Sequence, residues 1–238
     1  MSETYAEWAP PRDLAADVQC VWWSSFGPAA PILPDGHLDL IIGGDRVLIA
    51  GPDTAVAPND FPAGLVVHGV RFRTGRAHRV LGVPAEELRD QRVDLTDLWG
   101  ADGRRVAERL IENPQRHLGV VAAALADRPP EPDREVDAAI RRLVVDRPRV
   151  GDLPGELGIS ERQLRRRFTA AVGYGPAMFN RVVRMQRVRR LAESRPHDGL
   201  ADLAFAAGYS DQAHMSREIK NLTGMTARAL LRGRFVQE

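Results

Sequence analysis

Hydrophobic residues in the first hundred positions form short runs, which glycine, proline and aspartate separate. The runs VQCVWW, HLDLII, RVLIAG and LVVHGVRFR are rich in β-branched and aromatic residues. Runs of this kind between turn residues predict β-strands of an antiparallel sheet or a small barrel. From Ala85 to Asp127 the apolar residues instead recur every three or four positions, which predicts helices that follow the strands.

The pattern from Val136 to the end of the chain predicts helices alone, with Gly, Pro or Ser at the breaks. We therefore expect an α+β protein of two domains. A β-rich domain with trailing helices is predicted over residues 1–128, a proline-rich hinge over 129–134 and an all-α domain over 135–238. A length of 238 residues suits two domains of this size.

The all-α part contains an internal repeat. The octapeptide LPGELGIS at residue 153 aligns with LAFAAGYS at residue 203. In each copy a glycine, Gly158 or Gly208, ends one helix, an apolar residue fills the turn, and a serine, Ser160 or Ser210, caps the next helix. The predicted architecture is two helix-turn-helix units joined by a linker helix.

The second helix of each unit has one apolar face and one polar face. On a helical wheel, the apolar arc must pack on the preceding helix of the unit. This inward arc comprises Leu164, Phe168 and Val172 in the first copy and Met215, Ile219 and Leu222 in the second. The outward positions are Arg162, Arg166 and Thr169 in the first copy and Ala213, Arg217 and Lys220 in the second.

Charge divides unevenly between the two predicted domains, although the whole chain carries only +1. Residues 1–133 hold 13 Arg and 20 acidic residues, whereas residues 134–238 hold 19 Arg, one Lys and 12 acidic residues. A basic domain attracts polyanions and favours contacts with phosphates, which makes nucleic acid the expected partner. A solvated arginine-rich surface without a partner would give the same count.

The predicted linker helix, AMFNRVVRMQRVRRLAES after Pro176, is roughly 25 Å long at 1.5 Å per residue. With the radii of the flanking helices, the two units would lie about 34 Å apart, which is one turn of duplex DNA. Phosphate contacts are expected from serine caps and linker arginines, namely Ser160, Ser210, Arg181, Arg184, Arg187 and Arg190.

Two segments, LGISERQLRRRFTAAVGYGP and DLAFAAGYSDQAHMSREIKNLTGMTARAL, carry the most specific signal. They resemble the DNA-binding domain of AraC/XylS-type bacterial transcription regulators. The resemblance extends from about Glu135 to Gly233. Met215 and Ile219 stand where the family usually has Phe, Ala227 replaces its usual Pro, and Pro154 requires that its helix begin close by.

The resemblance implies that the residues early on each second helix read bases. These positions are Arg162, Arg165 and Arg166 in the first unit and Gln212, Ala213, His214 and Arg217 in the second; Thr169 and Lys220 complete the expected DNA contacts. Because Arg binds guanine O6 and N7 and Gln binds adenine N6 and N7, we expect a first half-site that favours guanine.

The segments PDGHLDLII and GVRFRTGRAHRVLGVPAEEL resemble a sensor-type domain that is often fused to such regulators. This domain is expected to bind an effector or to dimerise. The residues expected to form a pocket with apolar walls and a few polar anchors are Trp22, Trp23, Phe26, His37, Asp39 and Arg71. Ordinary core packing is the alternative for the tryptophans. Cys20, the only cysteine, is expected to be buried packing rather than a sensor thiol.

Motifs of enzymes are missing from the sequence. The six histidines form no HxH or HExxH pair, and there is no GxSxG, Walker A or GxGxxG. We therefore expect no enzyme activity, no cofactor and no metal site. The longest apolar stretch is far shorter than the roughly 20 residues of a membrane helix, and no export signal is seen, so the protein is predicted to be cytoplasmic.

The expected partners are double-stranded promoter DNA, a small-molecule effector, RNA polymerase and a second copy of the chain, with no membrane. Two alternatives stay open: an enzyme with a β-rich catalytic domain and a helical dimerisation domain, and an architectural protein that binds DNA regardless of its sequence.

Overall fold

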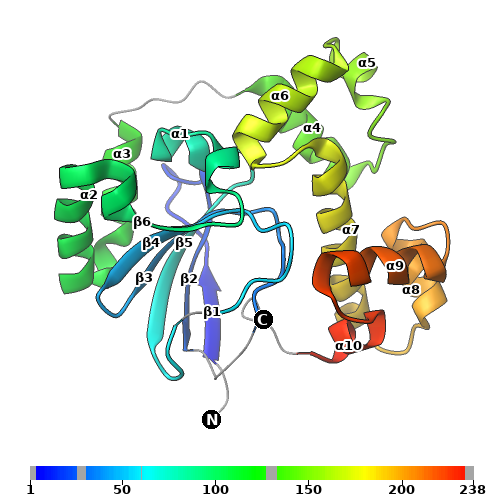
Figure 1. The fold of residues 1–238 in the computed structure, drawn as a ribbon, viewed down its shortest axis with the longest axis horizontal. Helices are drawn as coiled ribbons and strands as arrows, with labels where there is room; N and C mark the ends of the chain where they lie inside the picture. The colour runs from blue at the N-terminus through cyan, green and yellow to red at the C-terminus, as the bar shows by residue number, and fades with distance from the viewer. Residues whose placement is uncertain (1–3, 26–30, 60, 127–132, 234–238) are drawn as a thin grey trace.

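The computed structural model describes residues 4–25, 31–59, 61–126 and 133–233, which form a sheet domain and a helical domain side by side (Figure 1). The elements of the sheet domain are β1 (Thr4–Trp8), β2 (Val18–Ser25), β3 (Asp39–Gly43), β4 (Arg46–Ala50), β5 (Val66–Phe72), α1 (Ala77–Leu81), the 3-10 turn η1 (Ala85–Leu88), β6 (Arg92–Asp94), α2 (Leu95–Glu112), the 3-10 turn η2 (Pro114–Arg116) and α3 (His117–Ala126). The helical domain comprises α4 (Arg134–Val145), α5 (Leu153–Leu157), α6 (Glu161–Val172), α7 (Pro176–Ser194), α8 (Leu200–Ala207), α9 (Gln212–Thr223) and α10 (Ala227–Arg232).

The strands form a single antiparallel sheet in the order β1-β2-β5-β3-β4-β6. The structure therefore selects the sheet from the two predicted alternatives. The four predicted strand runs correspond to β2, β3, β4 and β5. The two outermost strands, β1 and β6, are additional, and β6 lies within the segment that was expected to be helical. Gly100, at φ 59°, breaks α2 into two helical parts.

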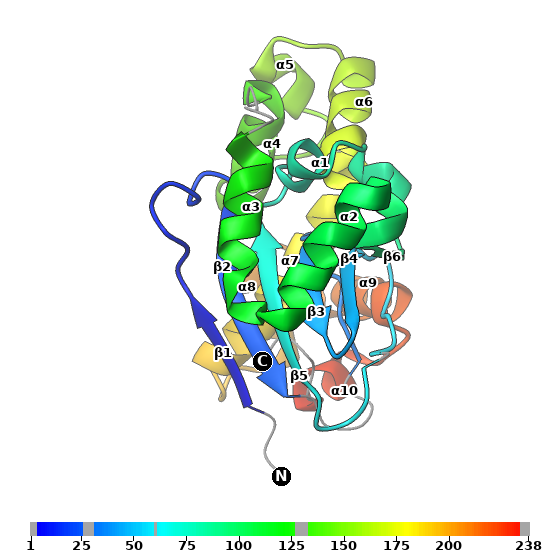
Figure 2. The ribbon, with the colours of Figure 1, turned by 90° about the vertical axis from the view of Figure 1, so that its left-hand side faces the viewer.

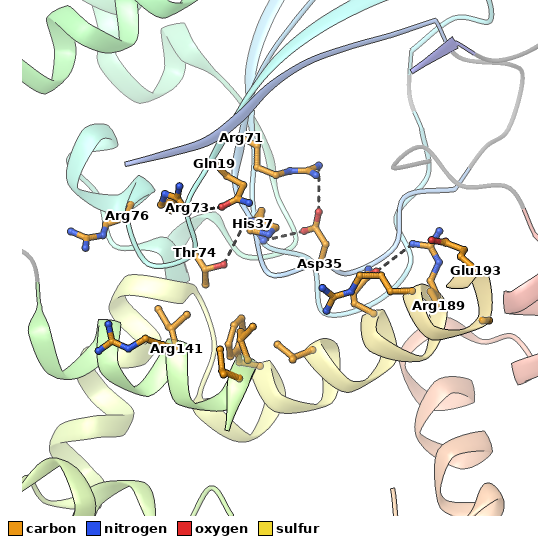
Figure 3. Close-up of a pocket in the computed structure, with 18 of the residues that line it drawn as sticks. Gln19, Asp35, His37, Arg71, Arg73, Thr74, Arg76, Arg141, Arg189 and Glu193 are labelled. Carbon is orange, nitrogen blue, oxygen red and sulfur yellow. Dashed lines mark hydrogen bonds and ion pairs between the residues drawn. The ribbon is translucent and has the colours of Figure 1, made fainter. Parts of the chain in front are cut away.

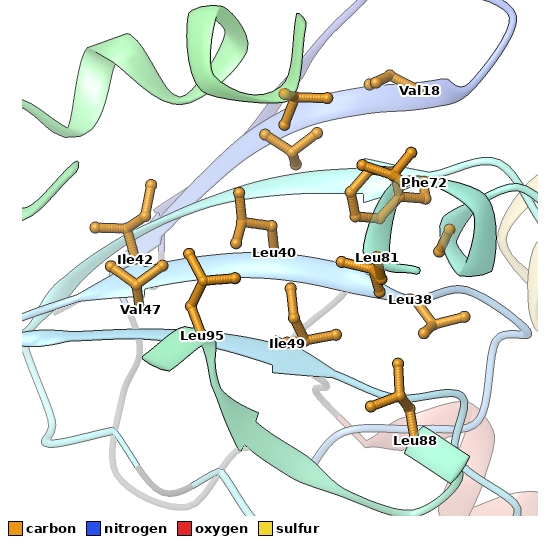
Figure 4. Close-up of a cluster of buried hydrophobic side chains, with 14 of the residues drawn as sticks. Val18, Leu38, Leu40, Ile42, Val47, Ile49, Phe72, Leu81, Leu88 and Leu95 are labelled. Carbon is orange, nitrogen blue, oxygen red and sulfur yellow. The ribbon is translucent and has the colours of Figure 1, made fainter. Parts of the chain in front are cut away.

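Both faces of the sheet are covered. Leu40 and Ile42 of β3 pack under α1, α2 and α3 in the main core (Figures 2 and 4). Ile41, between them, points to the opposite face, where Trp22 and Phe61 cover it. Because both faces are buried, these strands have continuous apolar runs rather than an alternating pattern. Full burial of one such side chain stabilises the fold by about 1.5–3 kcal/mol.

The helical domain has two separate hydrophobic cores, one for each predicted unit. Side chains from α4, α5 and α6 form the first core, and side chains from α8, α9 and α10 form the second. The linker helix α7 contributes Phe179 and Val182 to the first core and Met185 and Val188 to the second. This arrangement confirms two helix-turn-helix units joined by a linker helix, and the described residues after 133 form no strand.

The sheet domain packs closely on both units. Three glycines lie close to the other domain: Gly36 against Phe179, Gly75 against Ile140 and Gly173 against Pro52, where an added Cβ would lie 2.9, 2.8 and 2.4 Å from the nearest atom. Leu33, which precedes β3, is buried in the second-unit core. The side-chain amide of Gln186 on α7 donates to the main-chain oxygen of Pro34 at 2.7 Å. The segment before β3 thus docks along the linker helix.

The predicted hinge is only partly described, since residues 127–132 lie outside the described residues. Its end is already helical: Asp133 caps α4 by accepting a hydrogen bond from the Val136 N–H at 3.0 Å. None of the described helices combines the length and the apolar composition that a membrane crossing requires.

Candidate nucleic-acid interface

The turn of the first unit has the geometry that its residues predict. Gly158 ends α5 at φ 66°, in the left-handed region that favours glycine. The Ser160 hydroxyl accepts from the main-chain N–H of Gln163 at 3.2 Å, and the Gln163 side chain accepts from the Ser160 N–H at 2.9 Å. This reciprocal capping satisfies two N–H groups at the start of α6. Pro154 lies in the first turn of α5, where its missing N–H is tolerated.

The turn of the second unit differs at its cap. Gly208 ends α8 at φ 93°, as predicted. The cap of α9, however, is Asp211, whose carboxylate accepts from the His214 N–H at 2.7 Å, so the prediction that Ser210 caps this helix is wrong. The second copy has one extra residue after the serine, and that residue moves the cap by one position. The Ser210 hydroxyl instead hydrogen-bonds the Asp211 carboxylate and the His214 ring.

The second helices, α6 and α9, present the predicted faces to the protein and to solvent. All six residues of the predicted inward arcs are buried. The predicted base-reading side chains that are exposed are Arg162, Arg165 and Arg166 on α6 and Gln212, Ala213 and Arg217 on α9, with Lys220 further along α9. Thr169 and His214 are half-buried. Contact of any of these residues with DNA stays a prediction.

Two of the linker arginines, Arg184 and Arg187, face the protein rather than solvent. Arg184 donates from Nε to Glu218 Oε1 at 3.2 Å, and its Nη2 bonds the second carboxylate oxygen. The Arg184 guanidinium also lies 4.8 Å from the centroid of the Tyr209 ring. Arg181, which is partly exposed, approaches the same carboxylate at 3.6 Å. Glu218 on the inner side of α9 thus neutralises Arg184, which differs from the phosphate contact that the sequence led us to expect.

Arg187 departs furthest from its predicted role. Its side chain is buried and donates to main-chain oxygens of α4 and α8. A guanidinium in the interior is not available to a phosphate. Sequence position alone did not distinguish it from Arg190, which is exposed. Arg190 lines a cleft toward the sheet domain.

The predicted effector residues are only partly brought together. The indole N–H of Trp22 donates to Asp39 Oδ1 at 2.9 Å, and Arg71 Nε donates to the same oxygen at 3.2 Å. With His37 these side chains border a cavity of only about 40 Å³. Trp23 is half-buried at the next position of β2, so the pleat directs it to the other face. Phe26 lies outside the described residues.

A much larger cleft, of about 1190 Å³, separates the sheet domain from α4 and α7 (Figure 3). His37 and Arg71 reach it from the sheet domain. Arg190, for which a phosphate contact was predicted, also lines the cleft. No signal in the sequence indicated its other polar side chains, namely Gln19, Asp35, Arg73, Thr74, Arg76, Asp137, Arg141, Gln186, Arg189 and Glu193. They come from segments far apart in the chain, which only the docking of the two domains assembles.

Arginines dominate the electrostatics of this cleft. Burial alone would raise the pKa of Asp35, but Arg71 and His37 outweigh it, so the pKa of this carboxyl is lowered. Burial opposes the charge of Arg71, but Asp39 and Asp35 hold the pKa of its guanidinium well above the usual value. The Arg71 Nη2 lies 3.4 Å from Asp35 Oδ2. The Asp35 carboxyl and the Arg71 guanidinium are therefore both charged around neutral pH.

Cys20 is buried, as expected, and burial raises the pKa of its thiol to about 12. In the described ranges, His, Cys, Asp and Glu side chains form no group of three that would hold a metal ion.

Two family models match the chain. A helix-turn-helix domain model matches residues 154–233, and a model described as a domain of unknown function matches residues 6–94. The chain is 42% identical over 80 residues to a protein of two Mycobacterium tuberculosis strains, named probable bifunctional transcriptional activator/DNA repair enzyme AlkA. That match covers 32% of this chain and 16% of each relative, so the chain spans only a small part of their length.

Solved structures of ToxT from Vibrio cholerae are similar to the whole chain at low identity. One at 1.65 Å resolution has 8% identity, covers 97% of each chain and has a TM-score of 0.47. A second, with bound unsaturated fatty acid, has 9% identity, covers 98% of this chain and 95% of that chain and has a TM-score of 0.46.

The turns, caps and inward faces described above all lie within or beside the matched range. Residues 154–233 of this chain form a helix-turn-helix domain.

Proposed function

We propose that the protein is a transcription regulator that binds promoter DNA sequence-specifically, with α6 and α9 in successive major grooves. One observation carries this proposal: two equivalent helices, each preceded by a glycine turn and a capping side chain, both present an exposed polar face. That face has arginines at the start of α6, and it has Gln212 at the start of α9 with Arg217 further along. A recognition helix reads base edges with side chains near its N-terminus. The exposed arginines of α6 favour guanine, and Gln212 favours adenine.

The alternative functions do not explain the exposed faces of α6 and α9. An enzyme whose helical domain only dimerises would have no need for Arg162, Arg166 and Arg217 in solvent. The relative named transcriptional activator and DNA repair enzyme supports the proposal, because both activities in that name require DNA binding. As a transcription regulator the chain would work in the bacterial cytoplasm, with RNA polymerase and a second copy of itself as further proposed partners.

We also propose that a small molecule regulates DNA binding from the cleft between the domains. Six arginines line the cleft, namely Arg71, Arg73, Arg76, Arg141, Arg189 and Arg190, against Asp35, Asp137 and Glu193. This excess of positive charge favours an anionic effector. Ile140 and Phe179 add apolar wall to the cleft. A ligand there touches both domains, so its affinity depends on how they are docked, as regulation requires.

Selection of bound duplexes from a random-sequence pool tests the DNA-binding proposal. We expect the full chain to enrich one motif, and R162A, R166A and R217A each to weaken binding to it by about 1–3 kcal/mol. R104A, at an exposed arginine of α2, is the matched control and is expected to bind like the wild type. Equal affinity for the motif and its scrambled form would instead indicate an architectural protein.

A further inference from the structure

Arg187 lies near the middle of α7 and bonds both helix-turn-helix units. Its Nη2 donates to the main-chain oxygen of Val144 at 2.5 Å, and its Nη1 donates to that of Ala207 at 3.4 Å. Val144 belongs to the last turn of α4 in the first unit, and Ala207 is the last residue of α8 in the second. One guanidinium therefore joins the C-terminal ends of two helices from different units.

These oxygens are among those that a helix cannot satisfy by itself. The last four carbonyls of a helix have no partner within it. At the end of α8, Ala204 and Phe205 accept from the N–H groups that follow the helix, at Gly208 and Tyr209. Ala206 accepts from Arg147 Nη1 at 3.1 Å, and Ala207 accepts from Arg187. Two arginines thus complete the hydrogen bonding of this helix end.

The charge of Arg187 is held by these carbonyls rather than by a carboxylate. The described residues give Arg187 no ion pair, and burial together with Arg147, Arg190 and Arg184 lowers the pKa of its guanidinium. A buried cation without a carboxylate is costly unless other groups compensate it. The negative ends of the α4 and α8 dipoles, which both point at Arg187, supply that compensation.

Apart from these hydrogen bonds, the two units meet mainly through α7. Among the described residues the two cores share no fully buried residue, and the partly buried Met178 of α7 packs against both. Apolar packing of this kind is non-directional. Hydrogen bonds from a planar guanidinium to two carbonyls, in contrast, require a defined geometry.

We propose that Arg187 is a positioning residue that fixes the orientation of the second helix-turn-helix unit relative to the first, and thereby the spacing between the two half-sites that the chain recognises on DNA. This inference rests on the proposed function, since it assumes that both units bind one duplex. Arg147, which bonds the same end of α8, supports the same orientation.

If the two units are held in a fixed relative orientation, the chain must discriminate between duplexes that differ in the spacing of their half-sites. Each inserted base pair moves one half-site by about 3.4 Å and turns it by about 35° around the duplex axis. Units held at a fixed angle then cannot both reach their grooves, and the gain from binding two linked sites is lost. Units joined loosely follow the displaced half-site at little further cost.

The experiment measures the affinity of the full-length chain for a series of duplexes. The reference duplex is the one that the wild type selects from a random pool, and the others carry one or two base pairs inserted between its halves. For the wild type we expect insertion to weaken binding by at least about tenfold. For R187M we expect weaker binding to the reference duplex but less than about threefold further loss on insertion. R187K, which keeps a donor, should be intermediate.

Three further variants keep the result interpretable. R195A removes the same charge at the exposed C-cap of the same helix, outside the predicted DNA contacts and the cleft, and we expect it to keep the wild-type spacing ratio. R147A lies at an exposed position and should fold even if R187M does not, with a spacing ratio below that of the wild type. The spacing ratio of R184M, which removes another arginine of α7, is measured for comparison with that of R187M.

The outcomes separate the two proposals. If R187M, or R147A where R187M does not fold, discriminates between spacings as strongly as the wild type, the positioning role of Arg187 is overturned. If the wild type selects no duplex at all, the proposed DNA-binding function fails before the variants are compared.

Discussion

The Glu218 carboxylate on α9 and the Arg184 guanidinium on α7 form an ion pair with two hydrogen bonds, on the side of α9 that faces away from its exposed residues. The Glu218 side chain is only 8% exposed. The pair therefore joins the second recognition helix to the linker helix by a directional contact in addition to the apolar core of the second unit.

Removal of Glu218 should destabilise the helical domain. E218A leaves Arg184 partly buried without its carboxylate, and we expect the free energy of unfolding to fall by about 2–4 kcal/mol. Denaturant titration measures this change. The double variant with R184M should recover part of the loss, because no unpaired charge remains. E193A, at an exposed glutamate of α7, should change stability by less than about 0.5 kcal/mol. A double variant no more stable than E218A would contradict this account.

The glycine of the second turn is required by its backbone conformation. A Cβ at Gly208 would meet only Arg147, at 4.0 Å, so space does not exclude alanine there. The φ of 93° at this position is unfavourable for alanine, so we expect G208A to lose about 1–2 kcal/mol of stability.

G155A provides the matched control. Gly155 lies inside α5 and also has open space around it, but it is not among the glycines with positive φ. Alanine there should stabilise by about 0.5–1 kcal/mol. Thermal unfolding of both variants measures the difference. Changes of the same sign at Gly155 and Gly208 would contradict the conformational explanation.

Lowering the pH should reduce the stability of the folded protein, and His78 of α1 should contribute to this loss. Burial, assisted by Arg79 and Arg76 against the opposing charge of Asp133, lowers the pKa of His78 to about 4. Between pH 6.5 and 4 the unfolded chain therefore binds a proton that the folded chain does not, so stability falls as pH falls through this window. Solvent screens the neighbouring charges, and we expect about 1 kcal/mol from this residue.

The difference between wild type and H78Q isolates this contribution. The free energy of unfolding should fall from pH 7 to pH 4.5, and this fall should be smaller for H78Q than for the wild type. Equal pH dependence of the two proteins would rule out the assigned role of His78.

The Cys20 thiol should resist alkylation in the folded protein. It is 6% exposed, and burial raises its pKa to about 12. Iodoacetamide at pH 8 reacts with the thiolate, so we expect native Cys20 to react at least about a hundredfold more slowly than in denaturant. Mass spectrometry over time measures both rates. Comparable rates would show that Cys20 is accessible.

Local patterns predicted those features of the fold that depend on local physics. Gly158 and Gly208, the cap at Ser160 and the apolar arcs of α6 and α9 all follow from neighbouring residues. The edge strands β1 and β6 did not follow, since each pairs along only one side and carries few β-branched residues. Edge pairing depends on where the rest of the sheet ends.

The linker helix shows where sequence periodicity stops being informative. Helix α7 is surrounded by both units and the sheet domain, so its buried residues include Arg187 and Arg189 as well as Phe179 and Val188. No single polar face exists to separate inward from outward arginines. The carbonyls that accept from Arg187 belong to α4 and α8, which only the folded chain brings together. The cleft between the domains escaped prediction for the same reason.

Hydroxyl-radical footprinting of the full chain on its selected duplex tests the central claim most directly. If both units bind one duplex, we expect two protected patches on one face of it, about 10 base pairs apart. R162A should weaken protection of one patch, which should contain guanines. R217A should remove protection of the other patch. A single protected patch, or uniform protection that neither variant alters, would contradict the two-unit account.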